Sequence, residues 1–165
     1  MVSSSKTAVT TTARFRVRPL TECPLQAPAA RDLIESTWPE HYGAAGPGDA
    51  ASAIAARMRS TGLPIGFVAL HGDRLVGTVA LEKTSHGALP TEPLWMTGLA
   101  VEPSERRKGV GRALIRCVME HATSSHAAAV WCATQDAAGI VERIGWQPLC
   151  MTSDGWKVYR WAVDG

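Results

Sequence analysis

A basic, glycine-containing segment over residues 101–113 has the composition of an anion-binding loop. It reads VEPSERRKGVGRA and carries four cations and two glycines: Arg106, Arg107, Lys108, Arg112, Gly109 and Gly111. A phosphate can approach the backbone closely at a glycine, and basic side chains add local positive charge. A solvated basic turn shaped by glycines has the same composition, so the segment alone predicts an anion site and no particular ligand.

The elements on either side of this loop favour a diphosphate. A largely apolar strand is predicted over 94–101, of the kind that is covered on both faces. A helix is predicted from residue 110, because apolar residues recur on one face at Val110, Ala113, Leu114, Cys117, Val118 and His121. The start of a helix offers unpaired backbone N–H groups and the positive end of the helix dipole, and both bind anions.

Periodicity and turn residues predict short elements along the rest of the chain. Before the loop we expect a strand, two helices and a hairpin, and after its helix a strand, a short helix and two strands. The expected ranges are 14–18, 28–38, a helix capped by Asp49, the hairpin 65–70 and 75–81, then 127–133, 136–144, 146–151 and 156–163. Loops are expected over 41–48 and 82–93, and the second is long enough to touch a ligand.

The composition predicts a single domain over 14–165 after a flexible tail over 1–13. Apolar residues make up 45% of the 165 residues, charged residues 19%, and the net charge is +2. These values argue against a disordered chain and against a broad nucleic-acid-binding surface. No apolar run approaches the roughly 20 residues of a membrane span, and the N-terminus lacks the apolar core of a secretory signal. We therefore expect a cytoplasmic protein that binds neither nucleic acid nor membrane.

The four cysteines do not predict a metal site. They are Cys23, Cys117, Cys132 and Cys150. None of them forms a C-x-x-C pair, so a structural zinc site is not expected. A catalytic thiol needs an electropositive setting that lowers its pKa, so most cysteines are small core or near-surface residues.

The glycine spacing separates this loop from two other phosphate loops. There is no G-x-x-x-x-G-K-S/T, and the third glycine of a Rossmann G-x-G-x-x-G is replaced by Leu114. The segment does match the pattern Q/R-x-x-G-x-G/A from Arg106 to Gly111, with Val101 and Pro103 in place upstream.

In this motif, and in the order of elements from about Phe15 onward, the chain resembles the GNAT superfamily of acyl-CoA-dependent N-acetyltransferases. The resemblance implies an α/β (α+β) fold, with a mixed, mostly antiparallel sheet of about seven strands, a V-shaped splay and about four flanking helices. It implies acetyl-CoA as co-substrate, with no metal. Members of that superfamily are often homodimers.

The resemblance also assigns residues to coenzyme A. The motif strand of these proteins carries a bulge, and Gly98 is compatible with one. Backbone groups of that strand follow the pantetheine arm, and backbone N–H groups of the loop hold the pyrophosphate. The expected coenzyme A-binding residues are Leu99, Ala100, Val101, Arg106, Arg107, Lys108, Gly109, Val110, Gly111, Arg112 and Asp136.

The proton-transfer groups depart from the family pattern. The tyrosine that usually protonates the leaving thiolate is replaced by Val141, so the acid is another group or water, or none is needed. Glu82 is our first choice of general base because it follows a strand, where placement is rigid. His86 and Glu92 are alternatives, and each of the three is also readily explained as a solvated loop residue.

The amine acceptor is less well defined. Trp38 and Tyr42, with His41 between them, lie where GNAT proteins vary to bind the acceptor, and they also suit a cluster packed on the sheet. Trp95 either contacts the acceptor or fills the core. The leading hypothesis is direct acetyl transfer from acetyl-CoA to a primary amine of a small molecule or peptide. Two alternatives are a non-catalytic acyl-CoA sensor and a ping-pong enzyme that uses Cys132 as nucleophile.

Overall fold

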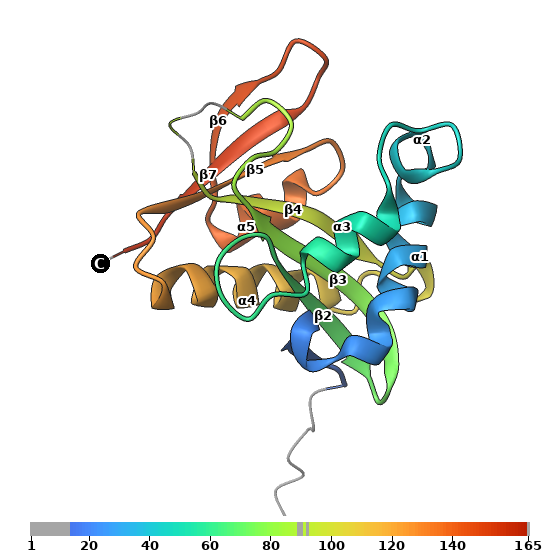
Figure 1. The fold of residues 1–165 in the computed structure, drawn as a ribbon. Coiled ribbons are helices and arrows are strands. Elements are labelled where there is room, and N and C mark those ends of the chain that lie inside the picture. Colours follow the sequence, from blue (N-terminus) through green and yellow to red (C-terminus); the bar gives the residue numbers. More distant parts are fainter. Residues whose placement is uncertain (1–13, 89–90, 92, 165) are drawn as a thin grey trace, which may run out of the picture.

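The centre of the protein is a seven-stranded sheet in the order β1-β2-β3-β4-β5-β7-β6 (Figure 1). The computed structural model describes residues 14–88, 91 and 93–164, so the expected tail over 1–13 and Glu92 lie outside the described residues. The strands are β1 (Arg16–Pro19), β2 (Ile65–His71), β3 (Arg74–Glu82), β4 (Trp95–Val101), β5 (Ala129–Thr134), β6 (Gln147–Met151) and β7 (Lys157–Ala162). Within this described sheet, every neighbouring pair is antiparallel except β4 and β5.

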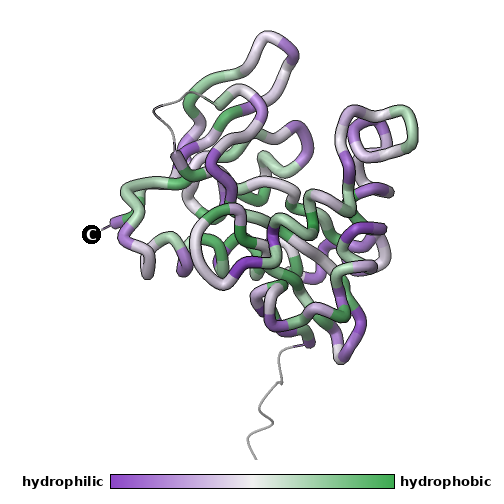
Figure 2. The backbone as a smooth tube through the Cα atoms, in the orientation of Figure 1, coloured by the Kyte–Doolittle hydropathy of each residue, from purple (hydrophilic) through white to green (hydrophobic). Residues whose placement is uncertain are grey.

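Helices cover both faces of the sheet (Figure 1). The helices are α1 (Ala27–Thr37), α2 (Pro39–Tyr42), α3 (Ala50–Ala56), α4 (Val110–Ser124) and α5 (Ala138–Ile144), with 3-10 turns η1 (Leu20–Glu22), η2 (Pro24–Gln26) and η3 (Pro103–Glu105). Successive strand residues point to opposite faces. Phe67 therefore packs in the core under α4 and α5, whereas Val68 packs in the core under α1 and α3. Figure 2 shows hydrophobic residues gathered in these central elements.

The expected elements are present, and their end signals act as predicted. The Asp49 side chain caps α3, where it accepts hydrogen bonds from the backbone N–H groups of Ala51 at 2.9 Å and Ser52 at 3.2 Å. Gly145 ends α5 in the left-handed conformation with φ of 106°. The mixed sheet with flanking helices confirms the fold class that the motif implies.

Two expected boundaries were wrong. The loop predicted to begin at His41 begins later, because α2 continues through Tyr42. His41 and Tyr42 therefore both lie on a helical turn. The loop predicted from Glu82 also begins later. Glu82 is the last residue of β3 and pairs with Trp95 of β4. Sheet pairing thus places this carboxylate on a rigid element.

β4 is irregular at Gly98. Thr78 of β3 pairs with Ala100, but Ala80 pairs with Thr97, so β4 contains an extra residue at this point. Gly98 has φ of 59°, which an ordinary side chain adopts only at a cost. The expected bulge is therefore present and bends β4.

β4 and β5 part from a single point. Trp95 pairs with Trp131, and the N–H of Trp131 donates to the carbonyl of Leu94 at 3.0 Å. Beyond that pair, no ladder joins the described residues of the two strands. The strands therefore form a fork that opens toward Val101 and Thr134, beside the start of α4. This is the V-shaped splay that the family resemblance implies.

Candidate functional site

The loop between β4 and α4 is shaped to present backbone N–H groups. Gly109 is the N-cap of α4, with φ of 88° and no side chain to cap the helix. The N–H groups of the first turn therefore keep no side-chain partner at this cap. Arg107 has φ of 61°, which is uncommon for a residue with a side chain. Successive turns of this kind form concave N–H surfaces that bind anions.

An ion pair missed by sequence reasoning holds this loop. Arg74, the first residue of β3, donates from Nη2 to Oε1 of Glu105 at 2.7 Å, and Lys108 Nζ lies 3.6 Å from Oε2. The Arg74 hydrogen bond is the main reason that the pKa of Glu105 lies below its usual range. The ion pair buries Glu105, which is 7% exposed, and ties the loop to the sheet. The sequence feature that could have indicated this pair is an acidic residue inside a basic loop.

The loop cations divide into two groups. Arg106 folds back and donates from Nε to the carbonyl of Val101 at 3.2 Å, so it shapes the end of β4. Arg107, Lys108 and Arg112 are exposed. The exposed cations surround the start of α4, where an anion would sit.

Small residues bring α4 close to the sheet and to α5. A Cβ at Gly77 of β3 would lie 2.9 Å from Leu114 Cδ1 and 3.0 Å from Val110 Cγ1. A Cβ at Gly111 would lie 3.6 Å from Ile140 Cδ1 of α5. The first turn of α4 therefore lies against both β3 and α5. Asp136, just before α5, is exposed.

Strand β4 forms the inner arm of the fork, and it carries the remaining residues expected to bind the donor. Leu99 and Val101 are half-buried, and Ala100 points its side chain into the core under α1 and α3. They follow the Gly98 bulge directly. The bulge breaks the regular ladder, which is how a strand exposes backbone groups to a ligand.

Glu82 lies at the closed end of the fork and is held by a buried arginine. Arg57, the residue that follows α3, donates from Nε to Glu82 Oε1 at 2.9 Å, and its Nη2 lies 2.9 Å from the same oxygen. The Arg57 side chain is 4% exposed and that of Glu82 is 28% exposed. Sequence reasoning missed Arg57, because its partner is 25 residues away and only the sheet brings them together.

A model of the acetyltransferase (GNAT) family matches residues 28–145. The chain belongs to this family. It is therefore an acyl-CoA N-acetyltransferase by family, and the Arg106–Gly111 motif lies inside the matched region. No curated protein matches the chain.

Solved acetyltransferases share the fold. One is an aminoglycoside 6'-N-acetyltransferase complexed with coenzyme A, at 14% identity and TM-score 0.74, covering 91% of this chain and 98% of the other. A second, from Enterococcus faecium, is an aminoglycoside 6'-N-acetyltransferase at 17% identity and TM-score 0.73, with coverage of 91% and 98%. A third is the ribosomal-protein-S18-alanine N-acetyltransferase from Escherichia coli, at 15% identity and TM-score 0.64, with coverage of 92% and 95%.

The tryptophan and tyrosine side chains that sequence reasoning placed near the acceptor are partly or fully buried, whereas His41 is exposed. Trp38 and Tyr42 are half-buried and pack against the core under α1 and α3, and the His41 and Tyr42 rings meet edge to face at 4.5 Å. Trp95 is fully buried, with its ring 6.5 Å from that of Trp131. Trp38 and Tyr42 therefore border the α1–α3 face of this acetyltransferase, and Trp95 contributes to its core.

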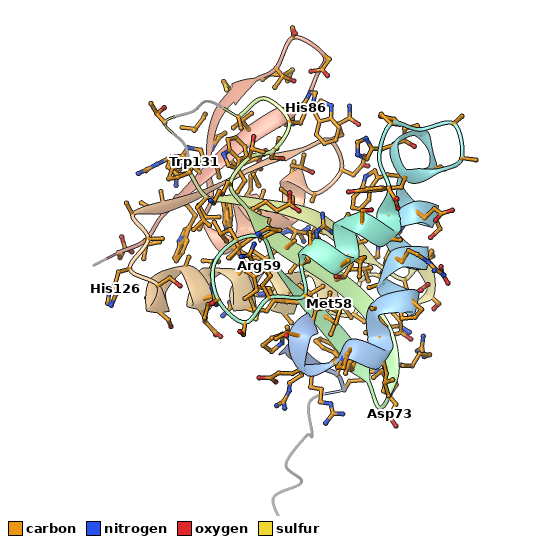
Figure 3. All side chains as sticks on the ribbon, in the orientation of Figure 1. Met58, Arg59, Asp73, His86, His126 and Trp131 are labelled. Atoms are coloured by element: carbon orange, nitrogen blue, oxygen red, sulfur yellow. The ribbon has the colours of Figure 1, made fainter. Side chains whose placement is uncertain are left out.

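His86 lies on the β3–β4 loop and contacts the β6–β7 hairpin. Its Nε2 is 2.7 Å from Oδ2 of Asp154 in the β6–β7 turn, and its ring lies 5.0 Å from that of Trp156 (Figure 3). Bonds from Thr152 and His86 hold the pKa of Asp154 below its ordinary value. The structure thus brings together Glu82 and the fork, while His86 joins the loop to the β6–β7 hairpin.

Val141 is fully buried on α5, and a different tyrosine lies nearby. Tyr159 of β7 donates its hydroxyl to Glu142 of α5 at 2.5 Å. This bond, assisted by burial, raises the pKa of Tyr159 to about 12. A phenol with so high a pKa is a weak proton donor, so Tyr159 does not simply replace the absent family tyrosine.

Two cysteines of this acetyltransferase, one buried and one half-buried, are poor nucleophiles. Burial raises the pKa of Cys132 on β5 to about 12 and that of Cys117 on α4 to about 11. The thiolate is the reactive form, and little of it exists at neutral pH with such values. This disfavours a ping-pong reaction through Cys132. Across 14–88, 91 and 93–164, no cluster of three or more His, Cys, Asp or Glu side chains is suited to a metal ion.

None of the helices in the described part of the chain is both long enough and apolar enough to span a membrane.

Proposed function

We propose that this protein transfers an acetyl group from acetyl-CoA to a primary amine, by direct attack within a ternary complex. The observation that carries the proposal is the loop from Val101 to Arg112, with its uncapped helix start and left-handed turns beside the β4–β5 fork. It is supported by membership of the acetyltransferase (GNAT) family.

In this proposal the donor lies along the loop and the inner arm of the fork. Backbone N–H groups from Arg107 to Arg112 hold the pyrophosphate, and the exposed cations neutralise its charge. The pantetheine arm follows Leu99 to Val101, and an N–H group after the bulge polarises the thioester carbonyl. Arg106 acts indirectly, by fixing the carbonyl of Val101, and Asp136 borders the donor from the α5 side.

The reaction forms one bond and breaks one. The neutral amine attacks the thioester carbonyl, the new C–N bond forms, and the C–S bond breaks to release the coenzyme A thiolate. Glu82 takes the proton that the amine loses. The thiolate then takes a proton from water, since Val141 has none to donate, and the hydroxide left behind takes the proton from Glu82 and restores its carboxylate. Alignment of the amine and the carbonyl supplies much of the rate gain.

The acceptor class is a small-molecule or peptide amine. Two of the similar structures are aminoglycoside acetyltransferases and the third acts on the alanine of a ribosomal protein, so this fold accommodates both kinds. We favour a small molecule, which would enter from the α1–α3 face bordered by Trp38 and Tyr42. Trp95 would then support the acceptor site from the core.

The test is a titration followed by turnover. Calorimetry should detect acetyl-CoA binding, and absence of binding at millimolar ligand would contradict the proposal. Thiol release is then measured with spermidine, kanamycin and a peptide with an N-terminal alanine, and mass spectrometry identifies the acetylated amine. The second candidate, a non-catalytic acyl-CoA sensor, is favoured by Val141. Binding without turnover on a broad amine panel would support the sensor.

A further inference from the structure

Arg57 is an unusual residue for the position that it occupies. It is 3% exposed, and its Nη1 has no hydrogen-bond partner among the described residues. Burying a guanidinium is costly unless it is paired and hydrogen-bonded. Its partner is Glu82, whose single oxygen Oε1 lies 2.9 Å from both Nε and Nη2 of Arg57.

Small residues in the sheet leave the space that the Arg57 side chain occupies. A Cβ at Gly66 of β2 would lie 3.1 Å from Arg57 Cβ, and one at Gly98 of β4 would lie 3.0 Å from Nη1. Between them in the ladder lies Ala80 of β3, which pairs with Gly66 and Thr97. A row of small residues thus lets the arginine cross three strands and end at the β4 bulge. Larger residues at either glycine would displace it.

The ion pair is asymmetric. Arg57 is sealed between α3 and the sheet, whereas Glu82 retains 28% side-chain exposure at the closed end of the fork. Oε1 is occupied by Arg57, and Oε2 makes no bond to any residue that the structure describes. Replacing a buried ion pair by apolar residues is often neutral or stabilising, so stability alone does not account for retaining such a pair.

We propose that Arg57 is the positioning residue of the acceptor site: it fixes Glu82 through Oε1, so that Oε2 receives the proton of the attacking amine. This inference rests on the proposed function. The same guanidinium lies against Gly98, so the carboxylate is held beside the bulge of β4. Arg57 itself touches neither the amine nor the thioester.

A double-mutant cycle in turnover tests this assignment. The variants are Glu82→Gln, Arg57→Met and the two combined, with Arg59→Met as control. Arg59 lies two residues further along and is exposed (Figure 3), and among the described residues its side chain donates only to the carbonyl of Leu63. The readouts are kcat with the best amine of the panel and the Kd of acetyl-CoA. We expect each single variant to lower kcat by about 100-fold and the double variant by no more than that.

Acetyl-CoA affinity should change by less than about twofold in these variants, because, in the part of the chain that the structure describes, the loop that holds the pyrophosphate contacts neither Arg57 nor Glu82. Arg57→Lys, which keeps the charge but loses the two-donor geometry, should recover part of the lost kcat. If Arg57→Met fails to fold because Glu82 is left unpaired, Arg57→Lys and the double variant still complete the comparison. The double variant leaves no unpaired charge.

Two results would overturn the inference, and they differ from failure of the proposed function. A further large loss when Arg57→Met is added to Glu82→Gln would show that Arg57 acts independently of the carboxylate. A normal kcat in Arg57→Met would exclude it as a positioning residue. Absence of turnover of every amine by the wild-type protein would instead reject acetyl transfer, and the role of Arg57 with it.

Discussion

The two halves of the candidate site are built on different principles. The donor half is mainly one continuous segment from Leu99 to Arg112, and it uses backbone N–H groups with several cations around them. The acceptor half joins Arg57, Glu82 and Gly98 from three separate elements, and it relies on individual side-chain contacts. The donor half should therefore tolerate loss of one side chain, whereas the acceptor half should not.

The largest effect is expected at the bulge. Gly98→Ala forces a side chain into a backbone with φ of 59° and places its Cβ 3.0 Å from Arg57 Nη1. A small displacement of the bulge misaligns amine and thioester, so kcat should fall about 100-fold. Steady-state kinetics measures this. Gly72→Ala is the matched control, with φ of 60° and nothing within 4 Å of the new Cβ. Equal kinetic losses in the two variants would mean that backbone strain alone is responsible.

A smaller effect is expected from a substitution in the donor loop, and it should appear as weaker binding of acetyl-CoA. Gly109→Ala places a side chain at φ of 88°, and the loop can relieve that strain only by turning its N–H groups away from the pyrophosphate. The Kd of acetyl-CoA should rise about tenfold, which corresponds to roughly 1.4 kcal/mol. Calorimetry provides the measurement. Gly155→Ala, at φ of 89° in the β6–β7 turn, should lose similar stability without changing this Kd.

Single cation deletions should have weaker effects still. Arg107→Ala and Lys108→Ala should each weaken acetyl-CoA binding by about twofold to fivefold, because exposed charges contribute little and their neighbours remain. The affinity should also depend less on salt concentration in each variant than in the wild type. Arg116→Ala, exposed on the next turn of α4, is the control. A loss of 100-fold or more at one cation would contradict the redundant design of the donor half.

The smallest catalytic effect is expected at Tyr159. Tyr159→Phe should leave kcat unchanged, because the Tyr159 hydroxyl is bound to Glu142 and its pKa is raised to about 12. The raised pKa means that this bond stabilises the fold below pH 10 and that the contribution is lost as pH rises toward about 12. Thermal unfolding measured from pH 10 to 12 should show that Tyr159→Phe loses less stability with rising pH than the wild type. A large fall in kcat would identify Tyr159 as the missing acid.

The same contrast explains what the sequence could predict. The donor loop was recognisable because its glycines, its cations and the start of α4 are contiguous, and local patterns specify helix starts and turns. Both the bulge and the fork were expected from the family resemblance, and Gly98 was compatible with the bulge. Arg57 was not foreseen, because an arginine after a helix is usually solvated. The space that Arg57 occupies becomes apparent only when the register of the sheet places Gly66, Ala80 and Thr97 side by side.

The most direct test of donor binding compares two ligands by amide NMR. Acetyl-CoA contains the pyrophosphate, and acetylpantetheine lacks it. With acetyl-CoA, the amide resonances of Arg107 to Arg112 should shift together with those of Leu99 to Val101. With acetylpantetheine, only the resonances of Leu99 to Val101 should shift. If acetyl-CoA leaves the amides of Arg107 to Arg112 unmoved, the loop does not hold the pyrophosphate and the account is contradicted.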